Sequence, residues 1–240
     1  MNTIKFENKG GIKMIAHRGL SGLEKENTCP AFVAAGVKSY YGIETDVHVT
    51  KDGKFIIIHD EDLKRIADID FDVEKNTFEA ARALRFKDTD GVTERADMFL
   101  PSLDEYIVIC RKYGKQSILE LKNTMPEEKV WEIAEQVKAL GWYEHTTFIS
   151  FSAENLVNLR KKYADADAQF LTGECGEKEI AFMVENKLDA DLMGYCVTKE
   201  NVERLHSAGL KVNCWTIDTI EHAEIMKACG VDMITSNILE

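Results

Sequence analysis

Residues 117–163 alternate twice between a short apolar run and a longer, partly polar one: Ser117-Ile118-Leu119-Glu120-Leu121, Glu127 to Leu140, Thr147-Phe148-Ile149-Ser150, and Glu154 to Tyr163. The short runs have the length and composition of buried strands, and the longer runs have the apolar spacing of helices. Strands that alternate with helices are typical of a parallel sheet covered by helices. This part of the chain therefore predicts two consecutive βα units.

The same alternation continues toward both ends of the chain. With the two strands above, the strand-like runs number about eight, which is the number that closes a TIM barrel. No G-x-G-x-x-G motif follows the first run, so a dinucleotide-binding fold is disfavoured. The predicted fold is α/β, a (β/α)8 TIM barrel. The further strands are Ile12–Ala16, Gly42–Val47, Ala168–Leu171, Asp191–Met193, Lys211–Trp215 and Met233–Thr235, with helices at Lys178–Asn186, Glu200–Ala208 and Ile220–Cys229.

One segment, at about residues 49–100, departs from this alternation. It holds an extra strand-like run, Phe55 to Ile58, followed by acid-rich stretches with two short helical patterns. We interpret it as a small insertion after strand 2, which should leave the barrel on the C-terminal face, where active sites of such barrels are built. No linker rich in proline or glycine divides the chain, so residues 1–240 are predicted to form a single domain.

Composition disfavours several classes of protein. Thirty basic and forty-two acidic side chains give a net charge of -12, which opposes binding to nucleic acid or to an anionic membrane. No stretch approaches the roughly 20 apolar residues of a membrane-spanning helix, and residues 1–13 lack a hydrophobic signal segment. The six cysteines are scattered without a C-x-x-C pair, so we expect reduced, structural thiols. We expect a soluble, cytoplasmic protein without membrane insertion, and the sequence carries no signal for its oligomeric state.

Polar residues at the ends of the first two strands are candidates for chemistry. The first strand ends in His17-Arg18-Gly19, which places an imidazole and a guanidinium where an anion can be bound and a proton moved. In the second strand, alternation puts Glu44 and Asp46 on one face, toward the barrel interior. Two buried carboxylates need a cation, either a bound metal or a network of basic side chains, and both interpretations remain open.

Three later segments add to this set. Glu120 supplies a third inward carboxylate, and three carboxylates suit Mg²⁺ or Ca²⁺. Lys122, two residues on, would hold a phosphate oxygen. His59 and Asp60 follow the extra strand and add a second imidazole, so that acid and base roles are both available. Trp215, at a strand end, could form an apolar wall for a small substrate, or it could be rim packing. The remaining histidines are interpreted as surface or structural: His48, His145, His206 and His222.

Read in order, these residues resemble the glycerophosphodiester phosphodiesterase family, a group of TIM barrels related to the phosphatidylinositol-specific phospholipases. The resemblance spans nearly the whole chain. It rests on His17-Arg18-Gly19, Glu26-Asn27-Thr28, Ala31-Phe32, Glu44-Thr45-Asp46-Val47, Thr50, Asp52-Gly53, His59-Asp60, Leu100-Pro101-Ser102-Leu103-Asp104-Glu105, Glu120-Leu121-Lys122 and Trp215-Thr216.

The resemblance implies a role for each of these positions. Glu44, Asp46 and Glu120 would ligate a divalent metal, Mg²⁺ or Ca²⁺, and Glu26 would lie near it. His17 and His59 would be the acid and base. Arg18 and Lys122 would bind the phosphate, with Trp215 against the substrate. The chain departs from the family pattern at Lys25, where proline is common, and at Thr235-Ser236-Asn237, which lacks the usual Thr-Asp.

The resemblance also implies an activity. A glycerophosphodiester would be hydrolysed to glycerol 3-phosphate and an alcohol through a cyclic phosphate. Alternatives on the same site are a lyase that stops at the cyclic phosphate, a phosphodiesterase for lysophospholipids, and a catalytically silent barrel that binds phosphodiesters or metal.

Overall fold

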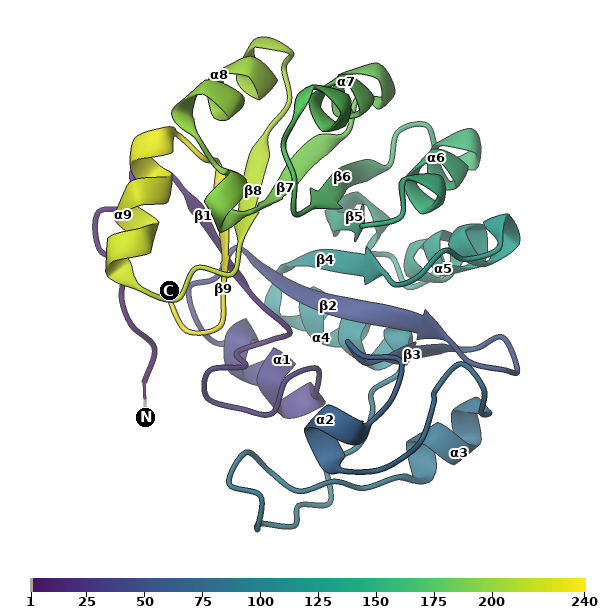
Figure 1. Cartoon of the computed structure of the whole chain (residues 1–240). Coiled ribbons are helices and arrows are strands. Elements are labelled where there is room, and N and C mark those ends of the chain that lie inside the picture. The colour runs from purple at the N-terminus through teal and green to yellow at the C-terminus, as the bar shows by residue number, and fades with distance from the viewer. Residues whose placement is uncertain (1) are drawn as a thin grey trace.

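The computed structural model describes residues 2–240, and its centre is a closed barrel of parallel strands (Figure 1). Each strand pairs with the next one around the barrel, and β1 closes it by pairing with both β2 and β9. The predicted TIM barrel is thereby confirmed. The parallel strands are β1 (Lys13–Ala16), β2 (Gly42–Val49), β4 (Gln116–Leu121), β5 (Thr146–Ser150), β6 (Asp167–Thr172), β7 (Asp189–Met193), β8 (Val212–Trp215) and β9 (Met233–Ser236).

Helices surround these strands on the outside (Figure 1). Most begin at a Ser or Thr whose hydroxyl accepts a hydrogen bond from the first turn, which satisfies a backbone N–H that has no partner within the helix. Ser102 and Glu105 form a reciprocal capping box at the start of α4. The helices are α1 (Cys29–Gly36), α4 (Leu103–Tyr113), α5 (Glu127–Ala139), α6 (Ala153–Lys162), α7 (Glu177–Asn186), α8 (Lys199–Ser207) and α9 (Ile220–Cys229), with short 3-10 turns η1 (Tyr143–His145) and η2 (Gly194–Cys196).

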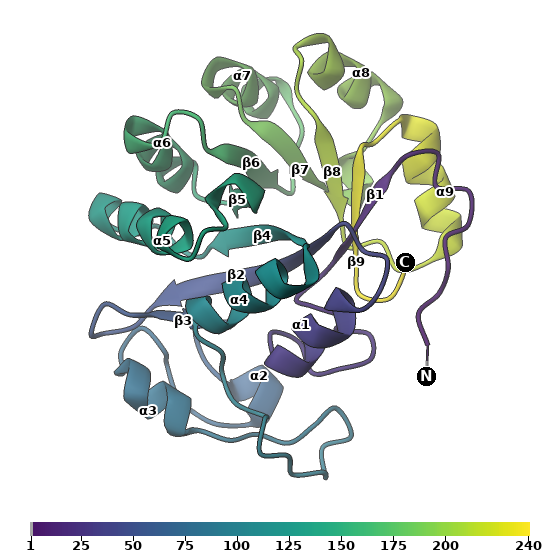
Figure 2. The ribbon, with the colours of Figure 1, turned by 180° about the vertical axis from the view of Figure 1, so that it is seen from behind.

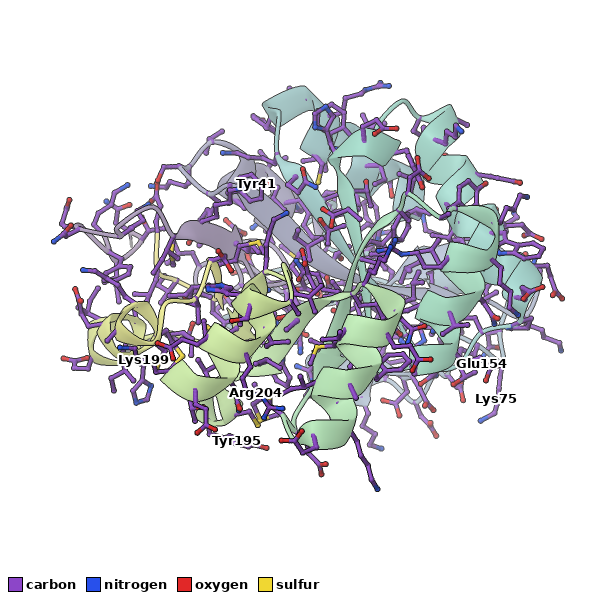
Figure 3. All side chains as sticks on the ribbon, turned by 90° about the horizontal axis from the view of Figure 1, so that it is seen from above. Tyr41, Lys75, Glu154, Tyr195, Lys199 and Arg204 are labelled. Atoms are coloured by element: carbon purple, nitrogen blue, oxygen red, sulfur yellow. The ribbon has the colours of Figure 1, made fainter. Side chains whose placement is uncertain are left out.

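Salt bridges on the surface link neighbouring helices of this ring. Arg204 of α8 binds both carboxylate oxygens of Glu177 of α7 at 2.8 Å, and Figure 3 shows Arg204 on the outer surface beside Tyr195. Exposed pairs of this kind contribute little to stability. The helices are therefore held mainly by the apolar layer between them and the strands, which forms the largest hydrophobic cluster.

Alternation along β2 determines which side chains face the barrel interior. Ile43 and Val47 point outward into the layer under the helices, so Glu44 and Asp46 point inward. Elsewhere the interior is filled by apolar side chains from several strands. This inner cluster consists of Ile15, Ile118, Ile149, Leu171 and Met233, with Trp215 packed against it.

The segment after β2 folds onto one side of the barrel. Its strand β3 (Phe55–Ile57) runs antiparallel to β2, with Val47 beside Ile57. Two short helices follow, α2 (Lys64–Ala67) and α3 (Phe78–Ala83), and both views place them next to β3 and outside the ring of longer helices (Figures 1 and 2). This segment has an apolar cluster of its own, in which Ile56, Ile58 and Leu63 are buried.

The two ends of the described chain lie side by side. Ile4 forms a parallel bridge with Leu239, and the Glu240 carboxylate accepts hydrogen bonds from the Thr3 hydroxyl and the Ser39 backbone N–H. Lys5 lies 2.8 Å from the same carboxylate. Among residues 2–240, no helix has both the length and the apolar composition that crossing a membrane requires.

Candidate active site

A cavity of about 80 Å³ opens at the C-terminal ends of the strands. This is the face of such barrels on which catalytic residues are found. The cavity brings together side chains from the first strand, the last strand and the segment after β2. Its lining residues are His17, Arg18, Glu44, His59, Glu120, Ile149, Phe151, Leu171, Asp191, Trp215, Thr216 and Thr235.

Three buried carboxylates meet at one side of this cavity. Asp46 of β2 stands beside Glu120 of β4 in the sheet register, and one oxygen from each of Glu44, Asp46 and Glu120 lies within 4.8 Å of the others. Burial, together with the nearby charge of Asp46, raises the pKa of Glu44 well above its usual value and that of Glu120 to about 8. Two of the carboxyls are therefore poorly stabilised as anions by the protein alone.

Asp46 differs from the other two carboxyls because cations face it. Burial alone would raise its pKa, but the charges of Lys122 and Arg18 lower the pKa below the usual range. Lys122 Nζ lies 3.5 Å from Asp46 Oδ1 and 2.8 Å from Glu120 Oε1, and Arg18 Nε lies 3.7 Å from Asp46 Oδ2. Asn27 donates a hydrogen bond of 2.7 Å to that same Oδ2.

The carboxylate group fits a divalent cation. Asp46 Oδ1 is buried and accepts no hydrogen bond, although buried acceptors nearly always have a partner. When all three carboxyl groups are ionised they carry three negative charges, and the cations beside them are Arg18 and Lys122, with one positive charge each. Basic side chains of the chain therefore compensate only part of this charge. Clustered carboxylate oxygens are the ligands that Mg²⁺ and Ca²⁺ prefer. These residues are consistent with the expected metal site.

An unusual backbone conformation aims Arg18 at these carboxylates. Its φ of 54° lies in the left-handed region, which side chains other than glycine seldom adopt. In this conformation its backbone N–H donates a 2.7 Å hydrogen bond to Glu44 Oε2. The next residue, Gly19, also has a positive φ, and a Cβ there would lie 2.7 Å from the Ala31 backbone. The turn therefore requires glycine at position 19.

A hydrogen bond with Asn237 fixes the orientation of the His17 imidazole. Asn237 donates from its amide nitrogen to Asp218 Oδ2 at 2.6 Å, so its carbonyl oxygen faces His17 Nδ1 at 2.7 Å and can only accept. Nδ1 must then carry the proton, which leaves Nε2 to face the cavity, 4.0 Å from Glu44 Oε2. Burial, with the nearby charge of Arg18, lowers the pKa of His17 to about 4.

His59 is fixed in a similar way by its neighbour in the chain. Its Nδ1 donates to Asp60 Oδ1 at 2.6 Å, and Arg65 Nε donates to the other Asp60 oxygen at 2.6 Å. Burial lowers the pKa of His59, against the opposing charge of Asp46. As in His17, the Nδ1 of His59 is occupied, so Nε2 is the nitrogen available for proton transfer.

Glu26 lies beside the carboxylate group but outside it. Its oxygens accept hydrogen bonds from Arg18 and Arg65 at 2.7–2.8 Å, and despite burial these two arginines lower its pKa. The expectation that Glu26 lies near the metal therefore stays a prediction. Lys122 reaches the carboxylates but is absent from the cavity lining, so its contact with phosphate also stays a prediction.

The other four histidines lie outside the cavity lining. His48 is buried and hydrogen-bonds Glu74 at 2.7 Å and the backbone oxygen of His59 at 3.2 Å, so it supports the segment that carries His59. His145 stacks on Trp142, His206 pairs with Asp232 at 2.9 Å, and His222 is exposed.

The far side of the cavity is mostly apolar. Ile149, Leu171 and Trp215 line it, and Phe151 meets the Trp215 ring edge-on with 5.8 Å between ring centroids. Trp215 thus lies where the sequence analysis expected an apolar wall. Sequence reasoning missed one polar member of this side, Asp191, because a single acid in an apolar strand gives no motif.

Comparison with known proteins agrees with this geometry. The family model described as "Glycerophosphoryl diester phosphodiesterase family" matches residues 17–239. A glycerophosphodiester phosphodiesterase of Bacillus altitudinis is 29% identical over 92% of this chain and 93% of its own length, and one of Caldanaerobacter subterraneus is 30% identical over 93% of both. A solved Oleispira antarctica phosphodiesterase, in complex with the product sn-glycerol-3-phosphate, shares the fold with a TM-score of 0.84 at 23% identity, covering 98% of this chain and 96% of that one.

Proposed function

Because the chain belongs to the glycerophosphoryl diester phosphodiesterase family, we propose that it hydrolyses glycerophosphodiesters to glycerol 3-phosphate and an alcohol. One observation carries the proposal: three clustered carboxylates share a cavity with two imidazoles whose Nδ1 atoms are both engaged. That arrangement supplies a cation site and two proton-transfer groups at one cavity.

Glu44, Asp46 and Glu120 would hold the divalent metal, Mg²⁺ or Ca²⁺. When bound, such a cation supplies positive charge that stabilises a phosphate oxygen in the transition state and lowers the pKa of a coordinated hydroxyl. Arg18 lines the cavity, and the Lys122 ammonium group lies next to the Glu120 carboxylate. We propose that both side chains bind the phosphate. Positive charge gathered here counteracts the net charge of -12, which would otherwise repel an anionic substrate.

The two histidines would move the protons of the first step. The Nε2 atom of one histidine takes the proton from the glycerol 2-hydroxyl as that oxygen attacks phosphorus. The bond between phosphorus and the head-group oxygen breaks, and the other histidine, which must begin the step protonated on both ring nitrogens, donates its Nε2 proton to this oxygen. The products of this step are a cyclic phosphate of glycerol and the free alcohol.

In the second step the histidines exchange roles. The histidine that lost its proton accepts one from a water molecule, whose oxygen attacks phosphorus. The bond from phosphorus to the 2-oxygen breaks, and the first histidine returns its proton to that oxygen. Glycerol 3-phosphate leaves, and both imidazoles are back in their starting states. The Asn237 and Asp60 hydrogen bonds would keep each Nε2 pointed at the substrate throughout.

The decisive experiment measures products with controlled metal. Purified protein is incubated with glycerophosphocholine and glycerophosphoethanolamine in Mg²⁺, Ca²⁺ or chelator, and glycerol 3-phosphate and cyclic phosphate are quantified. Metal-dependent glycerol 3-phosphate, lost in Glu44→Gln and His17→Ala, supports the hydrolase. Matched controls are Glu128→Gln and His222→Ala, whose side chains are exposed and outside the cavity.

Other products would identify a different activity on the same site. If cyclic phosphate is the end product, the enzyme is a lyase and not a hydrolase. If only lysophospholipids are turned over, its substrates are lysophospholipids and not glycerophosphodiesters. Metal or substrate binding without turnover would favour a silent barrel. No binding of Mg²⁺ or Ca²⁺ by calorimetry would mean that Arg18 and Lys122 compensate the carboxylates by themselves.

A further inference from the structure

Asp191 occupies the middle of β7 on the side of the cavity opposite the three carboxylates. In the sheet register it stands between Leu171 of β6 and Asn213 of β8, and its residue surface is only 2% exposed. It nevertheless belongs to the lining of the same cavity as His17 and Trp215. A ligand that reaches the histidines can therefore reach this carboxyl group.

Only one of its two carboxyl oxygens is satisfied by the protein. Oδ1 accepts a 2.9 Å hydrogen bond from the amide of Asn213. That amide also donates to Thr235 Oγ1 at 3.0 Å, and the Thr235 hydroxyl donates back to Asn213 at 3.3 Å. Among residues 2–240, no group donates a hydrogen bond to Asp191 Oδ2. One acceptor on this wall is left for a ligand.

Asp191 also lacks the cation that accompanies other buried carboxylates of the chain. Asp46 and Glu120 face Lys122, and Glu240 faces Lys5, whereas no Lys, Arg or His of residues 2–240 forms an ion pair with Asp191. Burying a carboxylate without a cation partner is energetically unfavourable. Burial raises the pKa of Asp191 to about 7, so the group can still be ionised near neutral pH. A cation from outside the chain would complete this arrangement.

Two aromatic rings line the same cavity as this carboxyl group. The indole N–H of Trp215 donates to the Asp191 backbone oxygen at 3.3 Å, which fixes the ring beside β7. Phe151 meets that ring at 87° and is half exposed at the cavity mouth. A carboxylate together with aromatic faces is the combination that binds ammonium groups, since the ring quadrupole and the negative charge both attract the cation.

We propose that Asp191, with Trp215 and Phe151, selects glycerophosphodiesters whose alcohol moiety carries an ammonium group. The inference rests on the proposed function, because it assumes that the phosphate is held at the carboxylate side of the cavity. An ammonium two carbons from the phosphate, as in ethanolamine or choline esters, would then lie toward the opposite wall. A neutral polyol head group offers hydroxyls but no charge, so it gains less from this wall.

Steady-state kinetics on three substrates test this. Wild-type protein, Asp191→Asn and Asp189→Asn are compared on glycerophosphoethanolamine, glycerophosphocholine and glycerophosphoglycerol. Asp191→Asn keeps the size of the side chain and the oxygen that faces Asn213. Asp189→Asn is the matched control, because Asp189 lies on the same strand, outside the cavity. We expect Asp191→Asn to lower kcat/KM about 10-fold for both ammonium substrates, mainly through KM, and to leave glycerophosphoglycerol within twofold of wild type.

The outcomes separate this inference from the function on which it rests. If wild type hydrolyses all three substrates and Asp191→Asn changes none of them, or changes all three equally, the hydrolase stands and the selection by Asp191 is wrong. An equal loss would mean that Asp191 acts on the common glycerol moiety or on the fold. If wild type hydrolyses none of the three, the proposed function fails, and the inference fails with it.

Discussion

The two sides of the barrel interior differ in charge. Along β2 and β4 the interior carries Glu44, Asp46 and Glu120, which with His17 form what we call the charged wall. On the opposite side, Ile149, Leu171, Trp215 and Asp191 form what we call the apolar wall. The change is abrupt, because Glu120 of β4 stands directly beside Ile149 of β5.

The difference shows how one barrel can use one wall for the chemical step and the other wall for binding the rest of the substrate. Like charges crowded on the charged wall raise the free energy of the empty site, and a cation with a phosphate would relieve that cost. The apolar wall offers hydrocarbon surface and one carboxyl, which suits the part of a substrate that does not react. Substitutions on the charged wall should therefore affect the chemical step, and those on the apolar wall should affect binding or stability.

The largest effect is expected from Glu44→Gln on the charged wall. Without this ligand the cation loses a charge partner, and kcat should fall about 10³-fold, equivalent to about 4 kcal/mol. Metal should also cease to protect the fold. In wild type, a free metal concentration 100 times Kd raises the free energy of unfolding by about 2.7 kcal/mol, and thermal unfolding with and without metal would measure this. Full activity in Glu44→Gln would place the metal elsewhere.

His17→Ala should give the next largest loss. Removing one proton-transfer group should lower kcat about 10²-fold, at the lower end of the range for general acid–base catalysis. Unlike Glu44→Gln, this variant should still be stabilised by metal, because the three carboxylates remain. Unfolding and turnover measured on the same preparations would separate the two roles within the charged wall. A His17→Ala variant that keeps wild-type kcat would exclude this histidine from the chemical step.

Periodicity in the sequence predicted the eight barrel strands, the helices α5 to α9 and the inward direction of Glu44, Asp46 and Glu120, because these depend on local pattern, whereas α1 and α4 were not among the predicted helices. It also placed His17 and His59 at strand ends, and the structure puts both in one cavity. The insertion after β2 was visible as a break in the alternation, and its strand β3 pairs with β2 next to the site.

Residues that depend on contacts distant in sequence were not predictable in this way. Asn237 stands 220 positions after His17, yet it determines which ring nitrogen of His17 carries a proton. Arg65 has no motif, but it holds both Asp60 and Glu26. The buried position of Asp191 follows only once β6, β7 and β8 are placed side by side. Each of these roles arises from closure of the barrel.

The apolar wall makes a prediction for stability through Asp191. Its pKa rises from 3.8 unfolded to about 7 folded, so the native state binds this proton more tightly than the unfolded state does. Wild type should therefore lose stability from Asp191 as pH rises from about 4 to about 7. Asp191→Asn lacks that loss, and its advantage in free energy of unfolding should grow by roughly 2.5 kcal/mol between pH 5 and pH 8.

Urea denaturation of wild type and Asp191→Asn at several pH values measures this difference. The raised pKa of Glu120 also changes wild-type stability with pH, but it is common to both proteins and cancels in the comparison. If the difference in free energy of unfolding between the two proteins stays constant with pH, burial does not raise the pKa of Asp191. The apolar wall would then not disfavour an ionised carboxyl group, contrary to the comparison of the two walls.

Trp215→Phe should have the smallest effect. It tests whether a side chain of the apolar wall affects substrate binding without affecting the chemical step. Phenylalanine keeps most of the apolar surface that lines the cavity but removes the indole N–H, and with it the 3.3 Å hydrogen bond to the Asp191 backbone. A neutral hydrogen bond contributes about 1 kcal/mol, so KM should rise about fivefold at most, while kcat stays near wild type. The reason is that Trp215 touches neither the three carboxylates nor the Nδ1 partners of the histidines. A fall in kcat with unchanged KM would show that this wall positions the reacting phosphate, and the division of the barrel into a chemical side and a binding side would then be wrong.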